Sequence, residues 1–176
     1  MKKEALEVLM NRRAIRAYKS EQVSEELLNT VLEAGIYAPT ARNNQSPVIV
    51  AVQNKEDRDT ITRLNAAVMG GDADPYYGAP TIIVVLGPKI AEFDCAHLDA
   101  SAVLTNMLNA AYAVGLGSVW IHRSEPVFNT EEGKALLRKW GVDEDLVGIC
   151  SMALGYPDGE HPAPKPRKEN YYRIIK

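Results

Sequence analysis

The sequence predicts a single domain that mixes α-helices and β-strands. Its 176 residues and 46% apolar content fit one compact domain with an ordinary hydrophobic core. Four short β-rich runs alternate with stretches whose apolar residues recur at helical spacing. No internal repeat, low-complexity tract or linker divides the chain, so we expect one domain over residues 1–176.

The first half of the chain is predicted to form two helices, a strand and a third helix. Leu6, Leu9 and Met10 keep helical spacing, which predicts a helix over residues 3–12. Ser24 is a suitable N-cap for a second helix, which should end before Pro39 because proline disfavours helix in the residue before it. The β-branched run 48–52 predicts a core strand, and a further helix should follow it.

The second half is predicted to contain three strands and two helices. Residues 69–80 are rich in glycine, aspartate and proline, which predicts a loop. Strands are expected at 81–86, 118–121 and 147–154, with a long buried helix from about 95 to 115 and a shorter one from Thr130 to Trp140. The last 20 residues are too polar and proline-rich to form a core element, so we expect them to lie on a second subunit.

Composition excludes several classes of partner and compartment. The 20 Lys and Arg against 23 Asp and Glu leave a net charge of -3, so no overall field attracts nucleic acid or an anionic membrane. The apolar stretch 95–119 is interrupted by polar side chains and predicts a buried helix rather than a membrane span. Two cysteines and no signal-peptide pattern favour a reducing cytoplasm.

Two groups of cationic residues could bind an anion. Arg12, Arg13 and Arg16 lie where the first predicted helix ends, and i, i+4 spacing would let Arg12 and Arg16 reach one point. Alternating prolines hold residues 162–167 extended, so Lys165 and Arg167 should project on the same side. Both groups suit a dianion. Solvated surface charge and a polyproline linker with incidental charges remain alternatives.

A loop between the second helix and the first strand carries hydroxyl and amide side chains. Its sequence is Pro-Thr-Ala-Arg-Asn-Asn-Gln, residues 39–45. Such groups both donate and accept hydrogen bonds, which suits a ribityl chain or a pyrimidine edge. Asn and Thr are also common turn formers, so an ordinary turn is the alternative interpretation.

Five segments in order resemble the nitroreductase family, and together they cover nearly the whole chain. They are Arg-Arg-Ala-Ile-Arg-Ala-Tyr (12–18), Ala-Pro-Thr-Ala-Arg-Asn-Asn-Gln (38–45), Tyr-Gly-Ala-Pro (77–80), Gly-Leu-Gly-Ser-Val-Trp-Ile (115–121), and Leu-Gly-Tyr-Pro (154–157) with Lys-Pro-Arg (165–167).

The resemblance implies a fold and a cofactor. The expected fold is an α+β three-layer sandwich whose central, mostly antiparallel sheet is flanked by helices, with a C-terminal tail that wraps the partner subunit. The expected assembly is a homodimer with FMN at the interface, reduced by NADH or NADPH as a transient donor. No dinucleotide-binding fingerprint is present, so the donor would bind over the flavin.

The resemblance and the chemistry of the side chains together suggest roles for individual residues. Arg16 is a candidate for tuning the flavin, because a guanidinium near N1 favours the reduced form. Tyr76 and Tyr77 could stack on a planar substrate, or could cover core at a dimer surface. The residues expected to bind the cofactor are Arg12, Arg13, Ala14, Arg16, Pro39, Thr40, Ala41, Asn43, Gln45, Asn65, Ile121, His122, Arg123, Lys165 and Arg167.

Three positions depart from the usual family pattern. Ala14 replaces a frequent Ser, Ser46-Pro47 replaces Pro-Trp, and the segment between Asn65 and Tyr77 is short. Cys95, His97 and Asp99 could suggest a metal site, but helical spacing separates His97 from the other two. We therefore expect no metal, and a buried, hydrogen-bonded helix start at this place.

The predicted function is that of an FMN-dependent NAD(P)H oxidoreductase. It would reduce a small organic acceptor, such as a nitroaromatic or a quinone, by ping-pong hydride transfer. One alternative is a flavin-binding carrier or sensor without turnover. The other is a reductase of the same fold that acts on enones or halogenated aromatics, because pocket shape and not a motif decides the acceptor.

Overall fold

The computed structural model describes residues 4–89, 95–143 and 145–176. Four strands form one antiparallel sheet in the order β1-β2-β4-β3. Their bounds are β1 Val48–Val52, β2 Thr81–Pro88, β3 Gly117–Ile121 and β4 Leu146–Gly155. The helices are α1 Ala5–Asn11, α2 Glu25–Ile36, the 3-10 turn η1 Ala41–Asn43, α3 Lys55–Val68, α4 Ala96–Ala113, α5 Ser124–Phe128 and α6 Glu131–Lys139.

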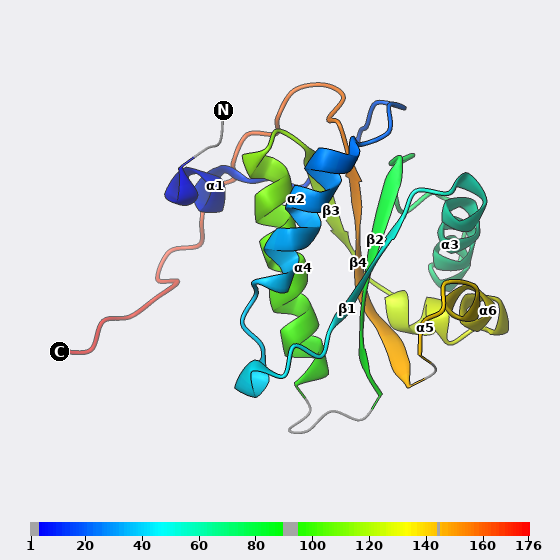
Figure 1. Cartoon of the computed structure of the whole chain (residues 1–176). Helices are drawn as coiled ribbons and strands as arrows, with labels where there is room; N and C mark the ends of the chain where they lie inside the picture. Colours follow the sequence, from blue (N-terminus) through cyan, green and yellow to red (C-terminus); the bar gives the residue numbers. More distant parts are fainter. Residues whose placement is uncertain (1–3, 90–94, 144) are drawn as a thin grey trace.

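The elements form three layers, as predicted. Figure 1 shows α2 and α4 on one face of the sheet and α3, α5 and α6 on the other. Each face has its own hydrophobic core, because the two faces of a strand carry alternate side chains. All residues of β2 except Pro88 are buried, as expected of a strand covered on both faces.

The helices begin where the sequence supplies a cap. The side chains of Ser24, Asn54 and Thr130 accept hydrogen bonds from the first turns of α2, α3 and α6. Just after the last turn of α4, Gly115 has a φ of 86°, which suits glycine as a helix terminator. The short helix α5 was not predicted, because five residues that include Pro126 show no periodicity.

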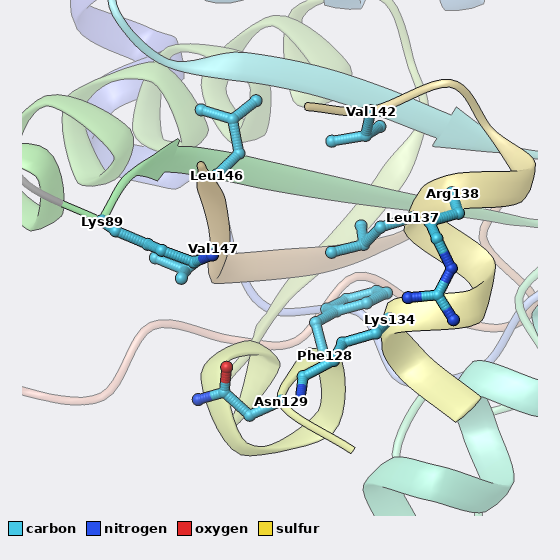
Figure 2. Close-up of a pocket in the computed structure, with 9 residues that line it drawn as sticks. All are labelled: Lys89, Phe128, Asn129, Lys134, Leu137, Arg138, Val142, Leu146 and Val147. Atoms are coloured by element: carbon cyan, nitrogen blue, oxygen red, sulfur yellow. The ribbon is translucent and has the colours of Figure 1, made fainter. Parts of the chain in front are cut away.

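The packing around α5 and α6 leaves a small hollow. Figure 2 shows Phe128, Leu137 and Val142 around it, at the start of β4. Its volume is about 130 Å³, and its rim carries the cationic side chains of Lys134 and Arg138. None of the residues predicted to bind the cofactor lines it, so this hollow is separate from the candidate site.

No helix among the described residues is both long enough and apolar enough to cross a membrane. The stretch 95–119 holds α4 and the first residues of β3.

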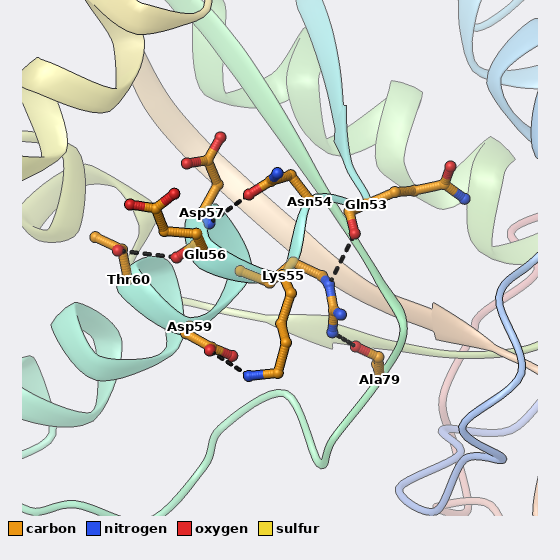
Figure 3. A network of polar contacts seen from close by, with 9 residues as sticks. Gln53, Asn54, Lys55, Glu56, Asp57, Asp59, Thr60 and Ala79 are labelled. Carbon is orange, nitrogen blue, oxygen red and sulfur yellow. Dashed lines mark hydrogen bonds and ion pairs between the residues drawn. The ribbon is translucent and has the colours of Figure 1, made fainter.

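A buried carboxylate joins α3 to α6. Asp57 is only 5% exposed, accepts a 2.5 Å hydrogen bond from Lys139 Nζ and a 2.9 Å bond from Trp140 Nε1, and lies beside its own helix cap Asn54 (Figure 3). These two bonds lower the pKa of Asp57, the Lys139 bond most, and outweigh the opposing effect of burial.

Replacing Asp57 with Asn should destabilise the fold by about 2–3 kcal/mol, because Lys139 Nζ and Trp140 Nε1 lose their shared charged acceptor. The effect should be measured by urea unfolding at fixed protein and cofactor concentrations. The matched control is Asp59→Asn on the same helix, whose exposed pair with Lys55 should contribute at most about 0.5 kcal/mol.

The destabilisation caused by Asp57→Asn should also depend on pH. The folded pKa of Asp57 lies below the unfolded value of about 3.9, so its stabilising effect is present above that value and is lost as pH falls through the folded pKa. The gap in unfolding free energy between wild type and Asp57→Asn should therefore narrow below about pH 4. An equal gap at pH 7 and pH 3 would contradict this role.

Candidate functional site

The segment after α1 brings the two ends of the chain together. The helix ends at Asn11 and Arg12 is extended (φ -55°, ψ 135°), so the predicted helical i, i+4 relation of Arg12 and Arg16 is wrong. Residues 12–18 instead run along the sheet, where Ala14 pairs with Ser118 beside β3 and Tyr18 pairs with Pro157 after β4. The arginines therefore lie next to the start of the C-terminal tail.

Three arginines gather at this corner. The pKa of Arg12 is lowered by burial first, and then by the positive charges of Arg13 and Arg167. Arg13 Nη1 donates to the carbonyls of Met10 (2.9 Å) and Arg12 (2.7 Å). Its Nε is buried and has no hydrogen-bond partner among the described residues. Like charges held together with a buried, unpaired donor form a site that an anion would stabilise.

Arg16 turns toward a different group. Its guanidinium carbon lies 5.9 Å from the centre of the Tyr77 ring, within cation–π range. Tyr18 packs against the core and donates to the Ile15 carbonyl (2.6 Å). Burial raises the pKa of Tyr18 against the opposing charge of Arg16, so its hydroxyl stays protonated. The surface here combines one cation with two aromatic side chains.

The loop 69–80 that carries Tyr77 is held in a fixed turn. The Asp74 carboxylate accepts from the backbone N–H of Tyr76 (2.7 Å) and of Gly78 (2.6 Å). These bonds hold Tyr77 at a φ of 58°, a left-handed conformation that is costly for a tyrosine. The Asp-Pro sequence at 74–75 is the turn signal that could have identified this carboxylate.

Side chains from two other elements anchor the end of this loop. Arg58 Nη1 donates to the Ala79 carbonyl (2.9 Å) and its Nε donates to the Gln53 carbonyl (3.3 Å); Figure 3 draws both bonds. Gln22 Nε2 donates to the Pro80 carbonyl (2.9 Å). The loop is therefore fixed from α3 and from the segment before α2.

The two tyrosines of the loop have different places. Tyr77 is 40% exposed, whereas Tyr76 is 2% exposed and its hydroxyl lies 3.0 Å from Ser151 Oγ inside the core. The prediction that Tyr76 contacts the substrate does not agree with this burial, because the ring is enclosed by the sheet and α3. Tyr77 alone of the pair lies where a substrate could reach it.

The end of β3 lies beside the same loop. Arg123 adopts a left-handed conformation (φ 77°) before α5, and its Nε donates to Asn65 Oδ1 (3.0 Å). Asn65 is fully buried and donates to the His122 carbonyl (3.1 Å). Because its amide is occupied by protein groups, the structure places Asn65 behind the 121–123 backbone rather than at an open surface.

The predicted polar loop 39–45 is tightly organised. Arg42, Asn43 and Gln45 all have positive φ values (51°, 57° and 50°), an unusual density of left-handed residues. The buried Asp99 carboxylate of α4 accepts from Ala41 N (2.9 Å), and Thr40 Oγ1 accepts from Gln45 N (3.0 Å). The expected hydrogen-bonded helix start at Asp99 is thus confirmed, and this residue supports the loop.

The polar loop and the arginine corner lie at opposite ends of α4. Asp99 is in the first turn of α4, whereas Ala14 pairs with Ser118 just beyond its last turn. A helix of 18 residues spans about 27 Å. Figure 1 shows the same separation, with α1 at one end of α4 and the short turn η1 at the other.

The described residues contain no group of three His, Cys, Asp or Glu side chains that could hold a metal ion. Cys150 is buried, and burial raises the pKa of its thiol to about 12, so it is not a nucleophile at neutral pH.

Comparison with known proteins gives consistent matches over the whole chain. The model of the nitroreductase family matches residues 9–73 and 69–156. FMN reductase [NAD(P)H] of Bacillus subtilis is 36% identical over 187 aligned positions, which cover 93% of this chain and 70% of that protein. The structure of a Bacteroides fragilis nitroreductase with bound FMN has a TM-score of 0.89 at 29% identity, covering 99% of this chain and all of that one.

Proposed function

Because this chain belongs to the nitroreductase family, we propose that it is a homodimeric, FMN-dependent NAD(P)H oxidoreductase that reduces a small organic acceptor. The observation that carries the proposal is the arginine corner, where Arg12, Arg13 and Arg167 gather and Arg13 Nε lacks a partner among the described residues. A phosphate monoester would neutralise these charges and accept the free N–H. FMN has such a group, and riboflavin does not.

The residues present fit FMN in their chemistry. Arg12, Arg13, Lys165 and Arg167 would hold the phosphate, while Arg16 would lie along the flavin ring and stabilise negative charge on its pyrimidine side. The backbone of Ile121–Arg123 would line the ring edge. Bound FMN would supply hydride acceptance and donation, and the protein would orient it and limit access of water.

The site requires two copies of the chain. Thr40, Asn43 and Gln45 suit the flavin, but α4 separates them from the arginine corner of their own chain by about 27 Å. We infer that these side chains, with Pro39 and Ala41, reach the flavin held by the partner's arginine corner. Exposed apolar side chains on α1 and on the tail favour this pairing, because a single chain leaves them in water.

Access to the flavin would be shaped by Tyr77. Its ring is exposed, fixed by the Asp74 turn and placed beside Arg16. A planar nicotinamide or acceptor could stack against it in turn, which predicts ping-pong kinetics with one shared pocket. The B. subtilis relative is named an FMN reductase and a Vibrio harveyi relative an NADPH-flavin oxidoreductase, which supports NAD(P)H as donor.

The test is an absorption spectrum of the purified protein after FMN is added and unbound flavin is removed. We expect the bands of oxidised flavin, and we expect NADH or NADPH to bleach them under nitrogen. Adding a nitroaromatic or a quinone should then restore the bands. A flavin that neither donor bleaches would indicate a carrier or sensor, and failure to retain FMN would overturn the proposal.

A further inference from the structure

A continuous chain of buried hydrogen bonds runs from α3 through the aromatic loop to β4 and β3. Asn65 Nδ2 donates to the Tyr76 hydroxyl (3.3 Å), which lies 3.0 Å from Ser151 Oγ. Ser151 Oγ donates to the Ile121 carbonyl (3.2 Å). All three side chains are at most 2% exposed, so water does not compete for these bonds.

The direction of each bond in this chain is determined. A serine hydroxyl has one proton, and Ser151 gives it to the Ile121 carbonyl. Tyr76 must therefore donate to Ser151 Oγ and accept from Asn65. Each hydroxyl then donates once and accepts once, an arrangement in which neighbouring bonds strengthen one another.

This chain of hydrogen bonds ends on two consecutive backbone carbonyls. Ile121 O accepts from Ser151, and His122 O accepts from the other proton of the Asn65 amide (3.1 Å). Arg123 completes the set by donating its Nε to Asn65 Oδ1 (3.0 Å). The backbone that leaves β3 is thus held at three successive residues.

This backbone needs such support. Arg123 has a φ of 77°, and a left-handed conformation costs a residue with a side chain about 1–2 kcal/mol. A glycine would adopt it without that cost. A conformation of this kind persists where surrounding bonds over-determine it, and Asn65 supplies two of them.

The same chain of hydrogen bonds also reaches the loop that carries Tyr77. Tyr76 is the residue before Tyr77, and its buried hydroxyl anchors one end of the turn that Asp74 closes. The position of the exposed ring and the orientation of the 121–123 backbone therefore share one support.

We propose that Asn65, Tyr76 and Ser151 are positioning residues that hold the 121–123 backbone and couple it to the Tyr77 loop. Given the proposed function, this backbone lines the flavin and Tyr77 faces the substrate, so the coupling links substrate contact to the flavin environment. The three residues act through the backbone and do not themselves touch the cofactor.

The test compares Tyr76→Phe and Ser151→Ala with wild type. Tyr76→Phe keeps the buried ring and removes only the hydroxyl. The matched control is Asp59→Asn, which removes an exposed ion pair from the same helix as Asn65 but outside this chain of bonds. The first readout is amide hydrogen exchange of Val127, whose N–H donates to the Arg123 carbonyl (3.2 Å), measured before FMN is added and relative to the exchange of β2.

Loss of one bond should speed exchange at Val127 roughly tenfold relative to β2 in either variant, and the control should leave that ratio unchanged. The second readout is the reduction potential of bound FMN, which should shift in both variants and not in the control. Unchanged exchange, or an equal rise in the control, would overturn the positioning role. Faster exchange with an unaltered flavin potential would overturn the coupling to the cofactor.

The first readout does not depend on the proposed function. If the wild-type protein fails to retain FMN, the proposed function fails while the exchange rates still decide whether these residues hold the backbone. If Tyr76→Phe does not fold, Ser151→Ala interrupts the same chain at its next bond and serves as the replacement.

Discussion

Replacing both Arg12 and Arg167 with alanine should weaken FMN binding by roughly 10²–10⁴-fold. Each charge-assisted hydrogen bond to a phosphate contributes about 1.5–3 kcal/mol, and Arg167 lies close enough to Arg12 for its charge to help lower the pKa of Arg12. Fluorescence titration of FMN against the flavin-free protein would measure the change. The double replacement removes two like charges, so the folded chain should not lose stability in the same proportion.

Riboflavin provides the control ligand for this prediction. Because it lacks the phosphate, its affinity should change by less than about threefold in the double variant. Lys168→Ala is the control variant, since Lys168 is an exposed cation adjacent to Arg167 in the same tail. An equal loss for FMN and riboflavin would show that the arginines support the fold and not the phosphate.

Replacing the four large apolar residues of the tail with serine should dissociate the proposed homodimer. These residues are 72–89% exposed in the single chain, although apolar residues of this size are normally buried. Burying each one on a partner would contribute on the order of 1.5 kcal/mol or more, so their joint loss should raise the dissociation constant at least about 10³-fold. The residues are Tyr171, Tyr172, Ile174 and Ile175.

Sedimentation velocity over a range of protein concentrations would measure this dissociation constant. The control replaces the polar tail residues Lys168 and Glu169 with serine, which should leave the dimer intact. Circular dichroism should show that the strands and helices remain, because the tail contributes no core residue. A dimer that persists after the four replacements would exclude the tail as the arm that joins the subunits.

Most elements of the fold could be predicted because they carry strong local signals. Ser24 and Thr130 cap helices as expected, and the β-branched runs form strands. The predicted end of α1 was correct to within one residue, but the extended course of the residues that follow it was not predicted. Residues 12–18 extend because Ala14 and Tyr18 pair with residues more than 100 positions away, and no local pattern contains that information.

The candidate site shows the same limit. The arginine groups at the two ends of the chain were recognised from residue type, and the structure brings Arg12 and Arg167 together. Tyr76 and Tyr77 look alike in sequence, yet tertiary hydrogen bonds bury one and expose the other. The support from Ser151 could not be predicted, since a serine in an apolar strand carries no signal of its partner.

The length of α4 has a thermodynamic consequence for the proposed dimer. If each flavin needs an arginine corner from one subunit and a polar loop from the other, then cofactor binding and subunit association are linked equilibria. Free FMN would draw subunits together, and dilution would release the cofactor, each by the same free energy. Because the 18-residue helix α4 keeps the two halves of the site apart within one chain, the fraction of protein that retains FMN would depend on the protein concentration.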